Sequence, residues 1–275
     1  MNEPLKSTLG DGVLTLTLSN PAARNAFTQK VGTQLATRLR EAAEDPAVRV
    51  VVLTGDGEHF CGGGDVKSFG TIDPDNALEV RWGDDPLWRD LEQRSLRIRR
   101  NSDLGLLLHT MGKPTIAMVR GAAAGAGLSL AAACDFRIAS ETAVFTTAFA
   151  RIGTSGDTGA SYFLLKLVGP TKARELMFLS EKIAAREALA MGLVSRVVAD
   201  AELETETLTF AQKLAQSAPI ALRHIKHNLL SAERMALEDA LDIEAQHMAR
   251  CFQTQDAKEA ITAFREKRTP HFSGR

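Results

Sequence analysis

The chain has 275 residues, of which 44% are hydrophobic, so it is long enough to bury one or two substantial cores. Its 33 basic and 34 acidic residues nearly cancel and are spread along the sequence, which argues against nucleic acid or a membrane surface as the main partner. The three cysteines lie far apart, without a CxxC pair or a His/Cys spacing, and predict free thiols in a reducing compartment and no metal site.

The N-terminus and the hydropathy of the chain bear on its location. MNEPLKSTLGDG has neither the apolar stretch of a signal peptide nor an Arg-rich amphipathic pattern. No apolar run approaches the length of a membrane span. We therefore expect a cytoplasmic protein that does not bind membranes.

Strand and helix patterns alternate through the first two thirds of the chain. VLTLTL at 13–18 predicts a strand, and residues 20–28 lead into a helix that runs to about residue 43. The β-branched run 48–55 predicts a strand buried on both faces. The polar stretch 71–112 contains both tryptophans and a predicted helix from about 86 to 109.

The same order continues after this polar stretch. Residues 115–121 and 136–140 predict two further strands, and each is followed by a helix pattern, at 123–134 and 161–169 respectively. Repeated strand, turn and helix predict an α/β fold of stacked β-β-α units rather than a six-stranded nucleotide-binding fold.

The pattern changes after Gly192, where glycines become few. Residues 202–217, 219–232 and 235–266 carry apolar side chains at three- and four-residue spacing, which is typical of helices. We expect residues 1–195 to form the β-β-α core with the ligand site. Residues 196–275 are expected to form a helical region whose apolar face packs on the core and on other subunits.

Two glycine-rich turns follow two of the predicted strands. FCGGGDV begins four residues after VVLTG, and GAAAGAGLS comes directly after TIAMVR. Each offers backbone N–H groups where side chains are minimal, and two such groups aimed at one point make an oxyanion hole. Each turn alone is also explained by tight turning and close packing. Neither contains a phosphate-binding GxxxxGK[ST] motif, and the partial GxGxxG lacks its downstream acidic residue.

Taken together, the segments of this chain resemble the crotonase (enoyl-CoA hydratase/isomerase) superfamily along nearly its whole length. The similar segments are RNAF (24–27), GDGEHFCGGGDVKSF (55–69), KPTIAMVRGAAAGAGLSLAAACDFRIAS (113–140), SYFLLKLVG (161–169), AREALAMGLVSRVV (185–198) and AITAFREKRTPHF (260–272). The resemblance implies a crotonase-like spiral and an oxyanion hole that polarises an acyl-CoA thioester and holds its enolate. It assigns the two N–H groups of this hole to Gly62 and Ala126.

The resemblance also implies how coenzyme A is bound. The positions expected along the CoA nucleotide or its pantetheine arm are Arg24, Ala26, Gly62, Gly63 and Asp65. Phe264 and Lys267 would reach the CoA of a neighbouring subunit in a homotrimer or a dimer of trimers. Coenzyme A is then part of the substrate, and no separate cofactor is expected. The Asp65 side chain also suits the N-cap of a following helix.

Hydratases of this superfamily use two glutamates, and the corresponding positions here are Ser129 and Phe149. Hydration needs an acid and a base with separate tasks. Because Ser129 and Phe149 can serve as neither, this chain lacks the usual catalytic pair. Ser129 stands outside a GxSxG nucleophile motif, and we expect it to line the pocket or pack in the core. Trp82 and Trp88 are expected either to line the acyl pocket with Phe149 or to cover the core.

The next carboxylate in the chain is Asp157, in a glycine-flanked loop before a predicted helix. It suits the N-cap of that helix. Several isomerase branches of the superfamily carry their catalytic Asp or Glu in a similar loop, G-x-x-P-[DE]-G-G. The sequence S-G-D-T is also similar to the G-N-D-T of 4-chlorobenzoyl-CoA dehalogenases, whose Asp is a nucleophile. The Trp and His that accompany that Asp are replaced here by Phe149 and by a residue near Ser102.

Other titratable residues favour structural roles. His59 is expected in the turn before Phe60, and Asp135 as a hydrogen-bonded structural acid. His224 and His227, three residues apart on a cationic helix without a third ligand, are expected at the surface.

The predicted function is that of an acyl-CoA isomerase of the EC 5.3.3 type. It shifts a double bond, or rearranges a ring-epoxide acyl-CoA, through a thioester enolate with Asp157 as the acid and base. The alternatives are a hydrolase or dehalogenase with Asp157 as nucleophile, a hydratase-like enzyme, and a non-catalytic CoA-binding homologue. Fatty acid or aromatic acid metabolism is the expected setting.

Overall fold

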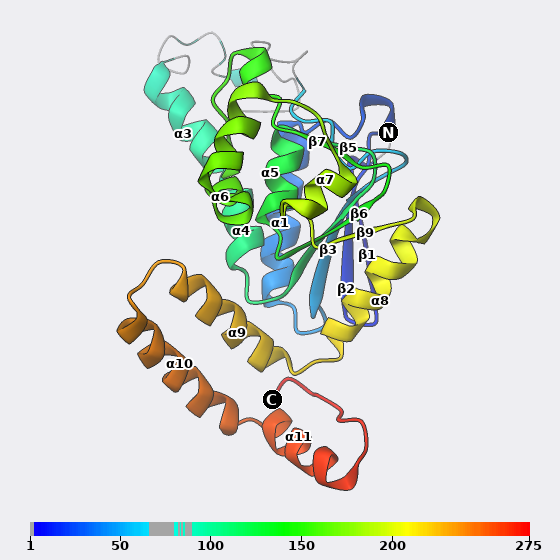
Figure 1. Ribbon diagram of the computed structural model, residues 1–275, viewed down its shortest axis with the longest axis vertical. Helices are drawn as coiled ribbons and strands as arrows, with labels where there is room; N and C mark the ends of the chain where they lie inside the picture. Colours follow the sequence, from blue (N-terminus) through cyan, green and yellow to red (C-terminus); the bar gives the residue numbers. More distant parts are fainter. Residues whose placement is uncertain (1–2, 66–79, 82, 84, 86–89) are drawn as a thin grey trace.

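The computed structural model describes residues 3–65, 80–81, 83, 85 and 90–275. A six-stranded sheet with the order β1-β2-β3-β4-β6-β9 forms its centre, and a smaller sheet has the order β5-β7-β8 (Figure 1). In chain order the strands are β1 (Leu5–Gly10), β2 (Val13–Leu18), β3 (Val50–Gly55), β4 (Thr115–Val119), β5 (Ala122–Ala124), β6 (Phe136–Ser140), β7 (Val144–Thr146), β8 (Ile183–Ala184) and β9 (Arg196–Val198). Neighbouring strands of the large sheet are parallel, except for the antiparallel hairpin of β1 and β2.

Helices cover both faces of the large sheet, as its sequence requires. They are α1 (Gln29–Glu44), α3 (Leu91–Asn101), α4 (Asp103–Thr110), α5 (Ala126–Ala133), α6 (Ala160–Leu179), α7 (Ala185–Ala190), α8 (Leu203–Ala215), α9 (Pro219–Ala232), α10 (Leu237–Phe252) and α11 (Gln255–Glu266). In β3, Val51 and Leu53 join the core that includes residues of α1, α5 and α6. Val50 and Val52 point to the opposite face and pack with residues of α8. Successive side chains of a strand point to opposite faces, so the apolar part of this strand, Val50–Leu53, is buried on both faces.

The predicted α/β architecture of strand, turn and helix is confirmed. The strands expected at 13–18, 48–55, 115–121 and 136–140 are β2, β3, β4 and β6. Several elements differ from the prediction. The hairpin strand β1 was not expected, the helix predicted for 235–266 is α10 and α11, and the one predicted for 86–109 is divided at Ser102 into α3 and α4 over its described part.

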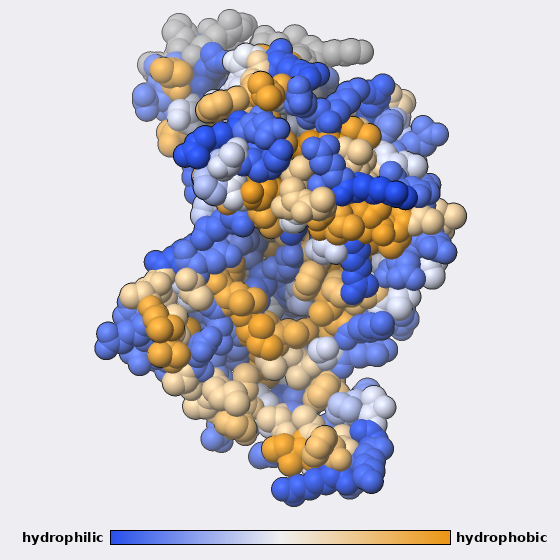
Figure 2. All heavy atoms as spheres, viewed as in Figure 1, coloured by the Kyte–Doolittle hydropathy of each residue, from blue (hydrophilic) through white to orange (hydrophobic). Residues whose placement is uncertain are grey.

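The last three helices extend away from the body of the molecule. Strand β9 belongs to the large sheet and α8 packs on it, so the extended arm begins with α9 (Figure 1). Between this arm and the body lies an open cavity of about 310 Å³, and Figure 2 shows apolar side chains gathered in this hollow. The cavity is lined at the C-terminal end of α5, by residues such as Ala132 and Asp135. The role of residues 196–275 in oligomerisation stays a prediction.

Among the described residues, the structure has no helix that is both long and apolar enough to cross a membrane.

Candidate active site

The two glycine turns lie side by side. Cys61 pairs with Ala123 of β5, since the Cys61 N–H donates to the Ala122 carbonyl at 2.9 Å and the Ala124 N–H to the Cys61 carbonyl at 3.0 Å. A Cβ placed on Gly63 would lie 3.1 Å from the carbonyl oxygen of Ala124. Two backbones can approach this closely only where one of them lacks a side chain. Segments 60 residues apart therefore meet at one point.

The first turn does not use Gly62 as the resemblance implied. The Gly62 N–H donates to the carbonyl of Arg24 at 2.7 Å, so it is not free to bind a thioester oxygen. Further along the turn, Gly64 pairs with Phe27 in a parallel bridge. The Phe27 N–H donates to the Gly63 carbonyl at 2.7 Å, and the Asp65 N–H donates to the Phe27 carbonyl at 3.3 Å. Alternate groups of an extended segment point to opposite sides, so the Gly64 N–H points away from Phe27, to the side of the second turn. Among the described residues it has no hydrogen-bond partner.

The second turn places the N–H of Ala126 at the start of α5, and its role in an oxyanion hole stays a prediction. Ala126 is the first residue of α5, and the preceding Gly125 has a φ of 50° and no side-chain cap. The N–H groups of the first helical turn have no partner within the helix, and the helix dipole makes this end electropositive. Within the described part of the chain the Ala126 N–H accordingly has no acceptor. Gly64 and Ala126 thus supply two unused donors at adjoining turns.

The predicted CoA-binding positions of the N-terminal half lie around the first turn. Arg24 is exposed in a left-handed conformation with a φ of 54°, and Ala26 follows it half-buried. Between them Asn25 is 2% exposed, and its amide donates to the carbonyls of Asp56 at 2.9 Å and His59 at 2.6 Å. Asn25 therefore fixes the strained turn that presents Arg24.

The helix predicted to follow Asp65 falls on residues 66–79, which lie outside the described residues, and its N-cap role stays a prediction. Trp82 and Trp88 also lie outside the described residues, so their place in an acyl pocket is not tested.

The two positions that hold glutamates in hydratases carry no acid or base. Ser129 is fully buried in α5, and its hydroxyl donates to the Gly125 carbonyl at 3.2 Å. Phe149 is 7% exposed, and its ring lies 3.8 Å from a Cβ placed on Gly125 and 3.6 Å from one placed on Gly156. The Phe149 ring therefore fills the space between the second turn and the loop that carries Asp157.

Asp157 directly follows Gly156, which lies against this ring. Solvent reaches its side chain, yet desolvation by the surrounding protein raises the pKa of the carboxyl group, against the opposing effect of a hydrogen bond from Thr158. The N-cap of α6 is Gly159, and no side chain caps the helix, so the capping role considered for Asp157 is wrong. The Asp157 carboxyl group therefore makes no capping hydrogen bond to α6.

Phe264 and Lys267 lie far from these turns within one chain. Both are exposed, Phe264 to 85%, at the end of α11. In Figure 1, α11 lies at the opposite end of the molecule from β5 and β7. They could contact coenzyme A only at the site of another subunit, which stays a prediction.

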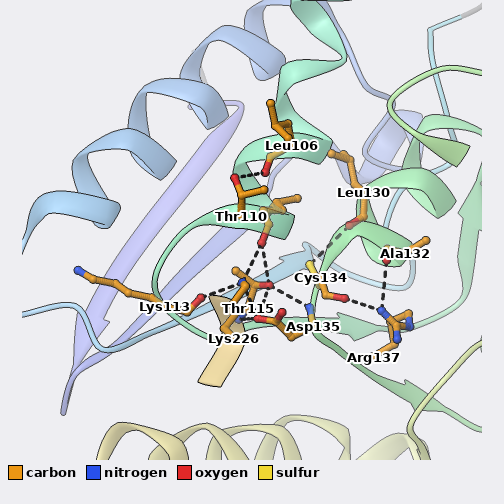
Figure 3. A network of polar contacts seen from close by, with 11 residues as sticks. Leu106, Thr110, Lys113, Thr115, Leu130, Ala132, Cys134, Asp135, Arg137 and Lys226 are labelled. Atoms are coloured by element: carbon orange, nitrogen blue, oxygen red, sulfur yellow. Dashed lines mark hydrogen bonds and ion pairs between the residues drawn. The ribbon is translucent and has the colours of Figure 1, made fainter. Parts of the chain in front are cut away.

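The remaining polar residues have structural roles, as expected for two of them. Asp135 accepts the Lys226 ammonium at 2.7 Å and the Thr115 N–H at 2.8 Å, in the network of Figure 3. Lys226 also donates to the carbonyls of Leu108 and Lys113, at 3.3 and 3.1 Å. His59 accepts the Ala122 N–H at Nδ1 over 3.2 Å, which ties the two turns together.

The chain belongs to the enoyl-CoA hydratase/isomerase family, whose model matches residues 8–275. It is an acyl-CoA enzyme of the crotonase superfamily. It is 32% identical to the 1,2-epoxyphenylacetyl-CoA isomerase of Escherichia coli (strain K12), over the full length of both chains.

Solved structures agree on the fold. An enoyl-CoA hydratase from Polaromonas sp. JS666 is 35% identical, with a TM-score of 0.84, and the match covers 98% of this chain and 99% of that one. A putative enoyl-CoA hydratase from Streptomyces coelicolor A3(2) is 33% identical with a TM-score of 0.87, and its match covers 99% and 95%. These similarities confirm the predicted crotonase-like fold.

Sequence reasoning missed two contributors to the site. The sequence Gly62–Gly64 does not show which N–H is engaged, because that depends on the pairing with Arg24 and Phe27. Asn25 lies within the RNAF segment but was not assigned a role. Its role could have been predicted, because Asn tolerates the left-handed conformation and forms hydrogen bonds to nearby backbone groups.

Proposed function

We propose that this protein is an acyl-CoA isomerase in which Asp157 moves a proton along the acyl chain. The observation that carries the proposal is the distribution of carboxylates. The two hydratase positions hold Ser129 and Phe149, while Asp157, which follows Gly156 in the loop that contacts the Phe149 ring, has a pKa raised by desolvation and does not cap α6. A carboxyl group with a pKa nearer neutrality can both take and return a proton.

The proposed reaction needs one carboxylate on one face of the substrate. The Gly64 and Ala126 N–H groups donate to the thioester oxygen of a 3-enoyl-CoA. Asp157 removes a proton from C2, and the electron pair enters the thioester as an enolate whose oxygen the two N–H groups stabilise. The enolate collapses, the double bond moves to C2–C3, and the proton returns from Asp157 to C4. No atom is gained or lost.

Coenzyme A enters this reaction as part of the substrate, and no further cofactor is required. We propose that Arg24, Ala26, Gly63 and Asp65 lie along its nucleotide and pantetheine arm. In a trimer or dimer of trimers, Phe264 and Lys267 would complete the CoA site of a neighbouring subunit. The exposure of both residues supports this arrangement.

The substrate class extends to ring-epoxide acyl-CoA esters. The 1,2-epoxyphenylacetyl-CoA isomerase of Escherichia coli is similar over the whole chain, and its name specifies such a substrate. A thioester held by two N–H groups, with one carboxyl group beside an aromatic ring, is compatible with that rearrangement too. Either substrate places the enzyme in fatty acid or aromatic acid metabolism.

The experiment that tests this proposal follows the protein's turnover by proton NMR in D₂O. With a 3-enoyl-CoA we expect the 2-enoyl isomer, and with crotonyl-CoA no hydration at ordinary hydratase rates. Rapid hydration would contradict the proposal in favour of a hydratase. Halide release from 4-chlorobenzoyl-CoA would favour Asp157 as a nucleophile. Binding of many acyl-CoAs without turnover, measured by calorimetry, would identify a non-catalytic homologue.

A further inference from the structure

We infer that Ser102 and Gly105, at the junction of α3 and α4, position the loop that carries Asp157. Ser102 is thus a positioning residue for the proton transfer and does not itself touch the substrate. The inference rests on the proposed role of Asp157 and adds the element that holds it.

The backbone of the Asp157 loop needs support from outside. Gly156, Thr158 and Gly159 have φ angles of 108°, 52° and 86°. A left-handed conformation is ordinary for glycine, but for a β-branched residue such as Thr158 it costs of order 1–3 kcal/mol. A loop with this backbone keeps its shape only where neighbouring elements hold it.

Ser102 supplies one such contact. Its hydroxyl oxygen accepts the N–H of Thr158 at 3.3 Å and donates to the carbonyl of Ile98 at 3.0 Å. Ser102 stands at the N-cap of α4, where a serine oxygen ordinarily accepts an N–H of the first helical turn, but it makes no such bond here. The Ser102 oxygen accepts the N–H of Thr158 in the loop instead.

Gly105 supplies the second contact. A Cβ placed on Gly105 would lie 2.5 Å from the carbonyl oxygen of Thr158, closer than atoms can approach without one of them moving. It would also lie 3.3 Å from the ring of Phe163, one turn into α6. The loop therefore rests directly on the backbone of α4, and only glycine at this position permits it.

These contacts act on the peptide groups next to Asp157. The N–H that Ser102 accepts belongs to the peptide bond between Asp157 and Thr158. Fixing the plane of that bond fixes the direction in which the Asp157 side chain leaves the backbone. A base must lie within hydrogen-bond reach of the proton it removes, so small changes of this direction lower the rate of proton transfer.

The test compares Ser102→Ala with Thr110→Ala. The Thr110 hydroxyl donates to the Leu106 carbonyl at 2.8 Å, as Ser102 does to Ile98, but no hydrogen bond joins it to another loop among the described residues. We expect Ser102→Ala to lower kcat for isomerisation about tenfold, the usual value of one hydrogen bond, with KM nearly unchanged. Thr110→Ala should leave both constants unchanged, and Ser102→Thr should restore most of kcat.

A second readout separates positioning from a general loss of stability. Ser102→Ala should move the acid limb of the pH profile of kcat/KM to lower pH, because a loosened loop admits water and returns the carboxyl group towards its ordinary pKa. Gly105→Ala should lower kcat further, since its Cβ pushes the loop away. Thermal unfolding of Ser102→Ala should stay close to that of Thr110→Ala.

The outcomes distinguish this inference from the proposed function. If Asp157→Asn keeps full activity, the proposed function fails. If Asp157→Asn is inactive but Ser102→Ala behaves like Thr110→Ala in kcat and in pH profile, the positioning role is wrong and the proposed function stands.

Discussion

Ala126 combines two properties at the scale of a single residue. It occupies the first position of α5, where its N–H has no helical partner, and it carries the smallest side chain that a helix favours. The N–H is therefore the group that this position offers to a ligand. A serine or another small residue would offer the same group.

Ala126→Pro tests this directly. Proline is accepted at the first position of a helix, as Pro219 shows at the start of α9, but it has no N–H. We expect steady-state kinetics to show a loss of kcat of at least about a hundredfold, the usual effect of removing one oxyanion-hole donor. Ala126→Ser, which keeps the N–H, serves as the control. A folded Ala126→Pro enzyme with full activity would show that this N–H does not bind the thioester.

Gly62 and Gly64 illustrate what a sequence leaves open at this scale. The glycine-rich composition of the turn correctly predicts a close approach to the second turn, since Gly63 lies against Ala124. Which N–H stays free depends on partners about 40 residues away, Arg24 and Phe27. That pairing depends on the tertiary fold, so the resemblance alone assigned the donor to Gly62, whose N–H is bonded to the Arg24 carbonyl.

At the scale of elements, prediction succeeded where one physical requirement dominates. Strand β3 is apolar on every side because helices cover both faces of the sheet, and no other element suits such a short β-branched run. Prediction failed where a helix ends because of a contact with a distant part of the chain. The division of α3 from α4 falls at Ser102, and Gly105 lies three residues after it inside α4. The Ser102 hydroxyl is bonded to a loop 56 residues away.

Three histidines lie at the contact between α9 and α10. Within α10, which is fully described, His247 is the buried residue. Its ring lies 4.1 Å from that of His224 and 4.9 Å from that of His227, both on α9, and its Nδ1 bonds the Asn228 side chain. The pair expected at the surface therefore helps to hold a helix–helix contact.

This contact predicts a loss of stability in acid. Burial, and then the nearby Arg250 and other cationic groups, lower the pKa of His224, and burial with the neighbouring histidines lowers that of His247. A lowered pKa in the folded state favours the neutral ring, so its stabilisation is complete above about pH 6.5 and declines as the pH falls below that value. The hydrogen-exchange protection factors of residues 237–252 should fall between pH 7 and pH 5.

His247→Leu should weaken this pH dependence, while His271→Gln, an exposed histidine outside the hairpin, should leave it as in the wild type. Equal protection of α10 at pH 5 and pH 7 in the wild type would contradict this account.

At the scale of the whole molecule, Lys226 is one of the side chains that fasten the C-terminal arm to the body. Within the fully described α9, Lys226 is the buried residue, and its ammonium group reaches Asp135 and two carbonyls of the core (Figure 3). The contacts join the arm to the C-terminal end of α5, whose N-terminal end carries the second turn. The anchor therefore stands at the opposite end of that helix from the Ala126 N–H.

Lys226→Met leaves the half-buried Asp135 without its cation and should destabilise the protein by about 1–3 kcal/mol, because a partly exposed carboxylate loses a charged hydrogen-bond donor. Urea denaturation measures this change. Lys166→Met, which breaks an exposed pair with Glu233, should change the free energy of unfolding by less than about 1 kcal/mol. Equal effects of the two variants would show that the Lys226 anchor does not hold the arm.

The central claim is that a single carboxylate, Asp157, transfers the proton. The most direct test measures kcat for isomerisation of a 3-enoyl-CoA by Asp157→Asn, together with calorimetric binding of the 2-enoyl product. The account predicts a fall in kcat of at least about a hundredfold, because the amide can neither take nor return the proton, with a nearly unchanged Kd. An Asp157→Asn enzyme that isomerises the substrate at the wild-type rate would contradict it.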